Sequence, residues 1–380
     1  ELDETWRVNW PDGQEVRIYR SLERTADELE RAFPGSGKAY RRFVEKMLEQ
    51  YERLTAFQRS APPKPWHMLT PSRLRSIPFL LRPLGSHLAS TGLPERVQHA
   101  LGIWTHIASQ PLSEAPAPLA FVPAIVHSRG AFVAKGGIHR VGEALLDIAR
   151  DNGVTVHFGT PVERIVREGH EVTAIEVAGE TRPVENVVSN APGIATLTQL
   201  VHPPEPRLTR ELKQLPLQSP GVAAYMTGDA SDDVPFLRFL LPDGEPCRLF
   251  IRFDGVDPTR ARQLRLLCPV DHSWAQRVGK AGQNEYLERV LGEDWWRAGI
   301  SNVEVHDTRI PVQWGRRHLL YKDSMNPVMT AAFMRRGRLA HDSSLARNLY
   351  LAGSATHPGQ WVSFAAISGI LAADALTGRG

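Results

Sequence analysis

The stretch NLYLAGSATHPGQWVSFAAISGILAADAL, Asn348 to Leu376, decides the fold of this chain. It predicts a short buried strand over Leu349 to Ala352, a glycine turn from Gly353 to Gly359, and an apolar helix from about Trp361. A helix that begins just beyond the carboxyl end of a strand presents unpaired N–H groups and the positive end of its dipole. Small helix residues allow close packing; they are Ser363, Ala365, Ala366, Ser368, Gly369, Ala372 and Ala373. The arrangement favours a flat, partly anionic cofactor.

These residues resemble the C-terminal FAD-binding motif of the phytoene desaturase and carotenoid desaturase family, which are amine-oxidase-like flavoproteins. That family has a Leu-Tyr-Leu strand, a glycine and Thr-His-Pro-Gly, found here at 349–351, 353 and 356–359. The resemblance implies FAD as cofactor, with contacts from Gly353, Ser354, Gly359, Gln360, Trp361 and Val362. After Gly359 the chain departs from the family's Gly-x-Pro-Gly-like run. We take this departure to favour a modified, hydroxylated carotene as substrate.

Length and composition narrow the class of protein. A chain of 380 residues can hold two domains with a substantial core. Its formal charge of +3 is too small to argue for a nucleic-acid partner. Two cysteines provide no disulfide framework and no metal spacing, so a reducing compartment is expected. No secretory signal is visible, and because the first residue is Glu1 we expect the natural N-terminus to be missing.

The clearest α/β pattern lies between residues 131 and 191. A Gly136-Gly137 turn precedes an amphipathic helix over Ile138 to Asn152. Strands are predicted at Ala131 to Ala134, Val154 to Phe158, Val162 to Val166, Val172 to Val177 and Val184 to Ser189. The resembling family has a Gly-Gly turn, a Val-x-x-Ile strand and a Val-Val-Ser-Asn-Ala segment in this order. By that resemblance Val162 approaches the adenine of FAD, and Asn190 and Ala191 lie near the dinucleotide; without it, each is an ordinary strand or turn residue.

The remaining patterns complete a mixed α/β fold. A hairpin is predicted over Thr5 to Tyr19 with an Asp12-Gly13 turn, followed by two helices, and strand-like runs recur between residues 201 and 345. The resemblance implies a two-domain, Rossmann-like FAD-binding fold with an interleaved substrate domain of sheet and helices. We expect the substrate domain at 1–128 and 201–345, and the FAD-binding domain at 129–200 and 346–380.

One element of the resembling family is not found. That family opens with Gly-x-Gly-x-x-Gly between its first strand and helix. Gly136-Gly137 with Gly142 has the wrong spacing, and Gly35-Ser36-Gly37 has the wrong context. The resemblance therefore predicts an N-terminally truncated chain whose affinity for FAD is reduced.

Residues 61–128 combine basic and apolar character. Between Ala61 and Ser113 five basic residues stand against the single acid Glu95, interleaved with apolar and aromatic residues. Such a composition suits an interfacial membrane contact, although a helical cap over the protein explains it as well. The uncharged span from Asn348 to Ala373 is interpreted as a buried cofactor helix rather than a transmembrane segment. We expect a cytoplasmic protein peripherally associated with the membrane.

The implied chemistry is removal of a hydride from an allylic carbon to flavin N5, with a proton leaving the neighbouring carbon. The helix N-terminus at Gln360, Trp361 and Val362 is suited to stabilising negative charge on the reduced flavin. Candidate proton acceptors are His357, Asp323 and His306. Asp323 lies in a segment, Lys322 to Pro327, that resembles a family segment with an aromatic residue at the place of Met325. No Ser/His/Asp arrangement, paired-carboxylate signature or metal cluster is found.

The leading hypothesis is an FAD-dependent desaturase of a carotenoid such as phytoene or a hydroxylated carotene. Its partners would be a long apolar polyene and a membrane surface, with no nucleic acid and no metal. Two alternatives stay open. One is a redox-neutral carotenoid cis-trans isomerase on the same fold. The other is a non-catalytic carotenoid- or lipid-binding remnant that no longer holds flavin.

Overall fold

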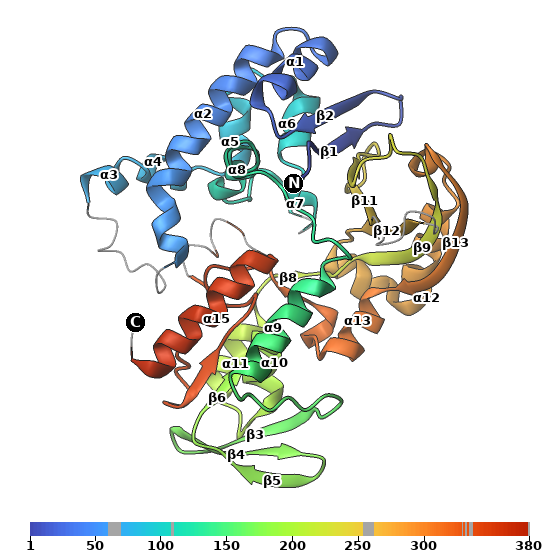
Figure 1. The fold of residues 1–380 in the computed structure, drawn as a ribbon. Coiled ribbons are helices and arrows are strands. Elements are labelled where there is room, and N and C mark those ends of the chain that lie inside the picture. The colour runs from blue at the N-terminus through green and yellow to red at the C-terminus, as the bar shows by residue number, and fades with distance from the viewer. Residues whose placement is uncertain are drawn as a thin grey trace. The chain divides into compact units, whose positions relative to one another are not determined.

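The computed structural model describes residues 1–59, 70–107, 110–253, 262–328, 330, 333 and 337–378. Figure 1 traces the helices and strands in chain order. The chain divides into two compact units, each assembled from three separate stretches. Unit 1 consists of Glu1–Tyr51, Phe79–Val156 and Pro220–Pro311, and unit 2 of Glu52–Pro78, His157–Ser219 and Val312–Gly380. Both units combine sheets with helices, so the predicted mixed α/β class is confirmed.

Unit 1 is organised around a seven-stranded sheet in the order β13-β9-β12-β11-β10-β1-β2. The strands are β1 (Glu4–Asn9), β2 (Glu15–Tyr19), β9 (Val222–Ala230), β10 (Leu237–Leu240), β11 (Arg248–Phe253), β12 (Arg262–Cys268) and β13 (Ile300–Arg309). Only β1 and β10 are parallel among these neighbours. Residues such as Leu240, Phe250 and Trp296 are fully buried in its core. The predicted β1–β2 hairpin is confirmed.

Helices of the N-terminal part follow the predicted signals. Helix α1 (Leu22–Ala32) starts where Ser21 accepts a hydrogen bond from the N–H of Arg24. A 3₁₀ turn, η1 (Thr55–Arg59), follows helix α2 (Ser36–Leu54). The other helices up to residue 129 are α3 (Pro71–Leu74), α4 (Ile77–Leu80), α5 (Leu84–Ala89), α6 (Glu95–Leu101), α7 (Trp104–Ile107), η3 (Ala117–Ala120) and α8 (Phe121–Arg129). Later in unit 1 come α12 (His272–Leu291) and η5 (Trp295–Arg297).

The apolar run from Ala115 to Ser128 forms core rather than surface. Ala117, Phe121 and Ala124 are all buried. This stretch is therefore a packed part of unit 1. Leu81, Arg75 and Arg82 are exposed, whereas Lys64, Trp66, Met68 and Leu69 lie outside the described residues. No described helix is both long and apolar enough to cross a bilayer.

Two predicted strands beside helix α9 are wrong. Helix α9 (His139–Asp151) forms as expected, but none of its side chains is buried. Ala131–Ala134 and Val154–Phe158 are not strands, because within the described chain neither is hydrogen-bonded into a sheet. Val154 is 52% exposed and Phe158 is 70% exposed. A period-2 apolar pattern does not make a strand without a neighbour.

The described residues of unit 2 form three small sheets. A four-stranded sheet has the order β5 (Glu180–Pro183), β4 (Glu171–Val177), β3 (Val162–Glu168) and β7 (Val201–His202). Two-stranded sheets pair β15 (Leu349–Leu351) with β6 (Val187–Ser189), and β14 (Asn326–Pro327) with β8 (Leu217–Gln218). The helical elements are α10 (Gly193–Ala195), a π-helical turn η4 (Thr196–Leu200), α11 (Pro206–Lys213), α13 (Pro311–His318), η6 (Tyr321–Asp323) and α15 (Val362–Thr377). Ile165, Leu197 and Leu349 belong to one core cluster, which joins these sheets.

Candidate functional site

The carboxyl ends of two parallel strands define the site. In strands β6 and β15, Val187 pairs with Leu349 and Ser189 with Leu351. The N–H of Ala352 continues the ladder with a 2.9 Å bond to the carbonyl of Ser189. Asn190-Ala191 and Gly353 therefore leave the sheet at the same edge, which is where ligands bind in open α/β sheets.

Gly353 and Asn190 are in direct contact at this edge. Gly353 has φ +93°, and a Cβ at this position would lie 2.4 Å from Oδ1 of Asn190. Any side chain would therefore be strained and would displace the amide of Asn190. The structure thus brings together two of the residues predicted to contact the dinucleotide.

Ser368 ties the glycine turn to helix α15. Its Oγ accepts a 2.8 Å hydrogen bond from the N–H of Gly353 and lies 2.6 Å from Oγ1 of Thr356. The Thr356 hydroxyl is also 2.9 Å from the Gly353 carbonyl, which accepts its proton. All three residues are buried. This network fixes where α15 begins relative to the strand ends.

The glycine turn also contacts the segment that follows η6, through Asn326. Oγ of Ser354 lies 3.2 Å from both the amide nitrogen and the amide oxygen of Asn326. Nε2 of Gln360 donates to Oε1 of Gln218 over 3.0 Å. The Gln360 side chain is thus engaged with protein, and its backbone remains the group expected to meet a ligand. Asn326 was not predicted, although the resemblance of Lys322 to Pro327 to a family segment pointed to this region.

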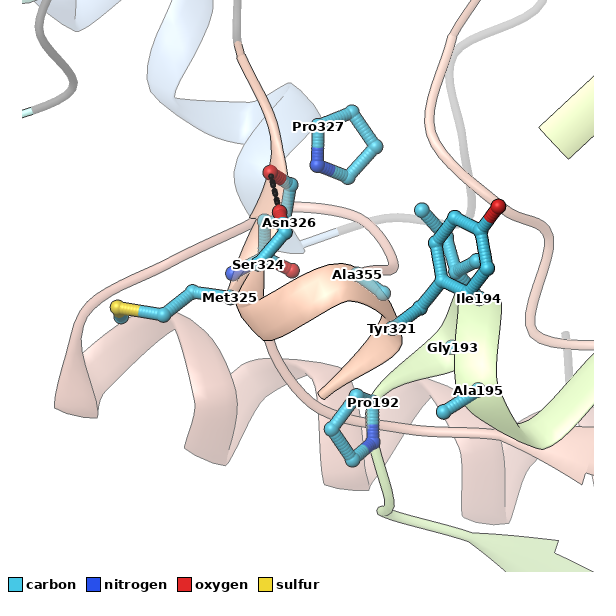
Figure 2. Close-up of a pocket in the computed structure, with 10 residues that line it drawn as sticks. All are labelled: Pro192, Gly193, Ile194, Ala195, Tyr321, Ser324, Met325, Asn326, Pro327 and Ala355. Carbon is cyan, nitrogen blue, oxygen red and sulfur yellow. Dashed lines mark hydrogen bonds between the residues drawn. The ribbon is translucent and has the colours of Figure 1, made fainter. Parts of the chain in front are cut away.

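A small hollow opens between this segment and α10 (Figure 2). Figure 2 shows Ser324 and Asn326 on one side and Pro192 and Ala195 on the other, while the side chain of Met325 points away. Oγ of Ser324 donates to the carbonyl of Asn326 over 3.1 Å. Ala355 of the glycine turn contributes to the lining. The hollow therefore adjoins the turn, but nothing in its lining is charged.

The start of α15 exposes an aromatic pair. Trp361 has φ +92°, which a bulky residue rarely adopts, and it is 45% exposed. Its ring stacks on Phe364 with a centroid distance of 5.5 Å and an interplanar angle of 9°. Val362 is also exposed, and no side chain caps the first turn. Since first-turn N–H groups have no intrahelical partner, this end of α15 combines a positive dipole with a flat apolar surface.

Arg338 lies against the glycine turn and was missed at the sequence level. Its Nη1 donates to the carbonyl of Ser354 over 2.8 Å. A Cβ on Gly359, which has φ +131°, would lie 2.4 Å from Nη2 of Arg338. Burial lowers the pKa of Arg338 to about 10, so it still carries its charge at neutral pH. In the sequence, Arg338 is the last residue of a basic segment that begins at Arg335, and such a segment is typical of a solvent-exposed surface.

Val162 is placed apart from these residues in the fold. It begins β3, pairs with Val177 in the four-stranded sheet and is 39% exposed. None of the described contacts joins it to the glycine turn. Its approach to adenine remains a prediction.

The three candidate proton acceptors are not assembled into one group. Nε2 of His306, in unit 1, lies 2.7 Å from the Thr227 hydroxyl. Asp323, in η6 of unit 2, adopts φ +57° and packs against Gly315. His357 is in the turn itself, and its Nε2 lies 2.5 Å from the carbonyl of Phe57. A carbonyl only accepts, so Nε2 carries the proton and Nδ1 is left as the basic atom. Burial lowers the pKa of His357, which keeps the ring neutral.

Parallel strands that end in a glycine turn, followed by a helix N-terminus, are typical of a dinucleotide-binding fold. Residues 95–377 match the flavin containing amine oxidoreductase family. This match spans well over half of the chain, so the chain belongs to that family, and FAD is its cofactor. Among the described residues, no group of three or more His, Cys, Asp or Glu side chains could hold a metal ion.

Similar proteins share the fold at low identity. The 4,4'-diaponeurosporene oxygenases of several Staphylococcus aureus strains are 21% identical over 418 aligned residues, covering all of this chain and 82% of the relative. An oxidoreductase from Methanosarcina mazei superposes with a TM-score of 0.62 at 13% identity, covering 97% of this chain and 80% of that one. A putrescine oxidase variant superposes with a TM-score of 0.60 at 12% identity, covering 99% of this chain and 82% of that one. A CLA-producing fatty acid isomerase from P. acnes superposes with a TM-score of 0.55 at 12% identity, covering 100% of this chain and 80% of that one.

The residues at the turn fit the isoalloxazine end of FAD. Gly353 and Gly359 allow Asn190 and Arg338 to pack directly against the backbone of the turn, and Arg338 places a shielded positive charge there. The exposed start of α15 adds donor N–H groups beside an apolar ring stack. These features suit an aromatic ring system with an electron-rich edge.

Proposed function

We propose that this flavin-dependent oxidoreductase desaturates a carotenoid, such as phytoene or a hydroxylated carotene. The observation that carries the proposal is the stacked pair Trp361 and Phe364 at the start of α15, next to the predicted flavin contacts. A flat, exposed aromatic surface suits a rigid polyene because dispersion contacts are gained along its whole length. The relationship to the diaponeurosporene oxygenases supports the same substrate class.

We assign different roles in the reaction to different residues of the turn. When bound, FAD supplies the acceptor for the hydride that leaves an allylic carbon. Gly353, Ser354 and Gly359 are proposed to bind the cofactor, and the backbone at Gln360, Trp361 and Val362 to face its pyrimidine edge. His357 can hold a proton at Nδ1, because its Nε2 is committed to the Phe57 carbonyl.

The test is product analysis. The chain is loaded with FAD, given phytoene in phospholipid vesicles, and the products are separated and identified by absorption and mass. We expect products that are lighter by two hydrogens per step and absorb at longer wavelength. Products of unchanged mass but altered double-bond geometry would replace the proposal with the isomerase alternative. Unchanged phytoene with a flavin-loaded chain would contradict both.

We further propose that the protein meets its substrate at a membrane surface in the cytoplasm. Moving a polyene of some tens of carbons from an apolar environment into water costs about 0.8 kcal/mol of free energy per CH₂-sized unit. Direct exchange with a bilayer avoids this cost and is therefore favoured. Arg75, Leu81 and Arg82 are among the exposed described residues of the basic, apolar region, and each could contact lipid.

Vesicle flotation tests this contact. We expect R75E/R82E to float less with anionic vesicles than the unmodified chain, because each basic residue near such a surface contributes about 1 kcal/mol. The matched control is R207E/R210E, which changes two exposed arginines of α11. Equal flotation of all three proteins would remove the electrostatic contact.

A further inference from the structure

Arg338 has donor atoms without a partner inside the glycine turn. Nη1 is satisfied by the Ser354 carbonyl, whereas Nε and Nη2 are shielded from solvent and have no hydrogen-bond partner among the described residues. A guanidinium has five N–H groups in a fixed plane, and burying them unpaired is costly. Burial lowers the pKa of Arg338, and no carboxylate among the described residues offsets it.

Two other arginines that are shielded from solvent have more hydrogen-bond partners than Arg338. Arg248 is almost fully buried and pairs with both Glu245 and Glu293, and only its Nε lacks a described partner. Arg238 is buried and burial also lowers its pKa to about 10, but its Nη1 donates to the carbonyls of Trp296 and Ala298. Only Nε of Arg238 is a buried donor without a described partner. Arg338 is thus a half-buried cation with two shielded donor atoms, Nε and Nη2, that have no partner among the described residues.

We propose that Arg338 is a flavin-binding residue whose guanidinium donates to the pyrimidine carbonyl edge of FAD and stabilises the negative charge that collects there on reduction. The two residues that its guanidinium touches, Ser354 and Gly359, are themselves predicted FAD contacts. The positive end of the α15 dipole lies just after Gly359 in the chain, so both positive potentials act at one end of the site. This inference rests on flavin binding at the turn and does not depend on the carotenoid substrate.

Sulfite is a direct probe of this charge. Sulfite adds its electron pair to flavin N5, and the displaced pair charges the N1–C2 carbonyl edge. A cation at that edge therefore strengthens the adduct without any substrate or turnover. Adduct formation is measured by titrating sulfite into the FAD-loaded chain and following the loss of the flavin's visible absorption band.

The variants are R338M, R338K and the matched control R238M. We expect R338M to weaken sulfite affinity by about tenfold or more, R338K to stay within about threefold of the unmodified chain, and R238M to leave the affinity unchanged. Sulfite affinity of R338M equal to that of the unmodified chain would overturn the proposal. Because the readout needs no carotenoid, it is independent of whether desaturation is observed.

Melting of the flavin-free chain supplies a second readout if R338M does not retain FAD. Removing an unpaired buried cation should leave the flavin-free R338M melting no lower than the unmodified chain, while FAD raises the Tm of R338K but not of R338M. If the flavin-free R338M melts several degrees lower, Arg338 is a structural residue and the proposal is wrong.

Discussion

Helices α1 and α9 belong to the same unit and carry the same amphipathic pattern, yet their apolar faces have opposite environments. Leu29 of α1 is 1% exposed, whereas Leu145 and Ile148 of α9 are each 58% exposed. Helix α1 packs beside β2, which is hydrogen-bonded into the large sheet. The segments that flank α9 belong to no sheet in the described structure. An amphipathic pattern therefore fixes the helix, while its burial depends on a partner that the local sequence does not supply.

The largest expected effect contrasts the same substitution on the two helices. L29A should lower the free energy of unfolding by about 2–5 kcal/mol, because it removes a fully buried side chain and leaves a cavity. L145A should change it by no more than about 0.5 kcal/mol, because that side chain is already largely in water. Denaturant unfolding measures both. A large loss for L145A would mean that the α9 face is covered in solution.

The next effect extends the contrast to two glycines of the C-terminal region. G353A should destabilise the chain by about 1–3 kcal/mol, since a Cβ would strain the φ +93° backbone and displace Asn190. G369A, within α15, meets no atom within 4 Å and should stabilise the flavin-free chain by about 0.5–1 kcal/mol. Thermal unfolding of both variants checks the signs. Equal changes in stability for G353A and G369A would contradict a strained backbone at Gly353.

A smaller effect is a loss of stability in acid caused by buried histidines. Burial lowers the pKa of His127, whose Nε2 lies 2.7 Å from the Tyr40 hydroxyl, and those of His87 and His357. The unfolded chain binds protons first as the pH falls, so the free energy of unfolding should decrease below about pH 6.5. Urea unfolding between pH 8 and 5 measures the slope. H127N should flatten it, and an unchanged slope would show that His127 does not contribute.

The smallest expected effect concerns the exposed face of α9 alone. L145E/I148E should reduce binding of a hydrophobic fluorescent dye while changing the free energy of unfolding by no more than about 0.5 kcal/mol. Dye fluorescence and urea unfolding are measured on the same samples. An unaltered dye signal would show that this face is not the accessible apolar surface.

Much of the fold could be predicted because local signals and partners lie close in sequence. The β1–β2 hairpin has its turn between two adjacent strands, and Ser21 caps α1 directly. The strand, turn and helix at the C-terminus are also continuous, which is why Leu349–Leu351 and the start of α15 were placed to within a residue. The strands beside α9 were predicted wrongly because strand formation depends on a distant neighbour.

The candidate site was predictable only in its continuous part. Gly353 and Gly359 were predicted because their motif lies in one stretch, and Asn190 because its Val-Val-Ser-Asn-Ala segment resembles one in the family; the pairing of β6 with β15 brings Asn190 to the same edge. Arg338 and Asn326 reach the turn through tertiary contacts from another segment. Their residue types are common on surfaces, so the sequence carries no signal of their burial against Gly359 and Ser354.

The most direct test of the account is an FAD titration of the chain and of G359A, followed by flavin fluorescence. A Cβ at 359 would overlap the guanidinium of Arg338 and widen the turn, whereas G369A alters an open position of the neighbouring helix. The account predicts saturable binding by the unmodified chain and by G369A, with at least about a tenfold loss in G359A. Equal affinity of G359A and the unmodified chain would contradict a flavin site at this turn.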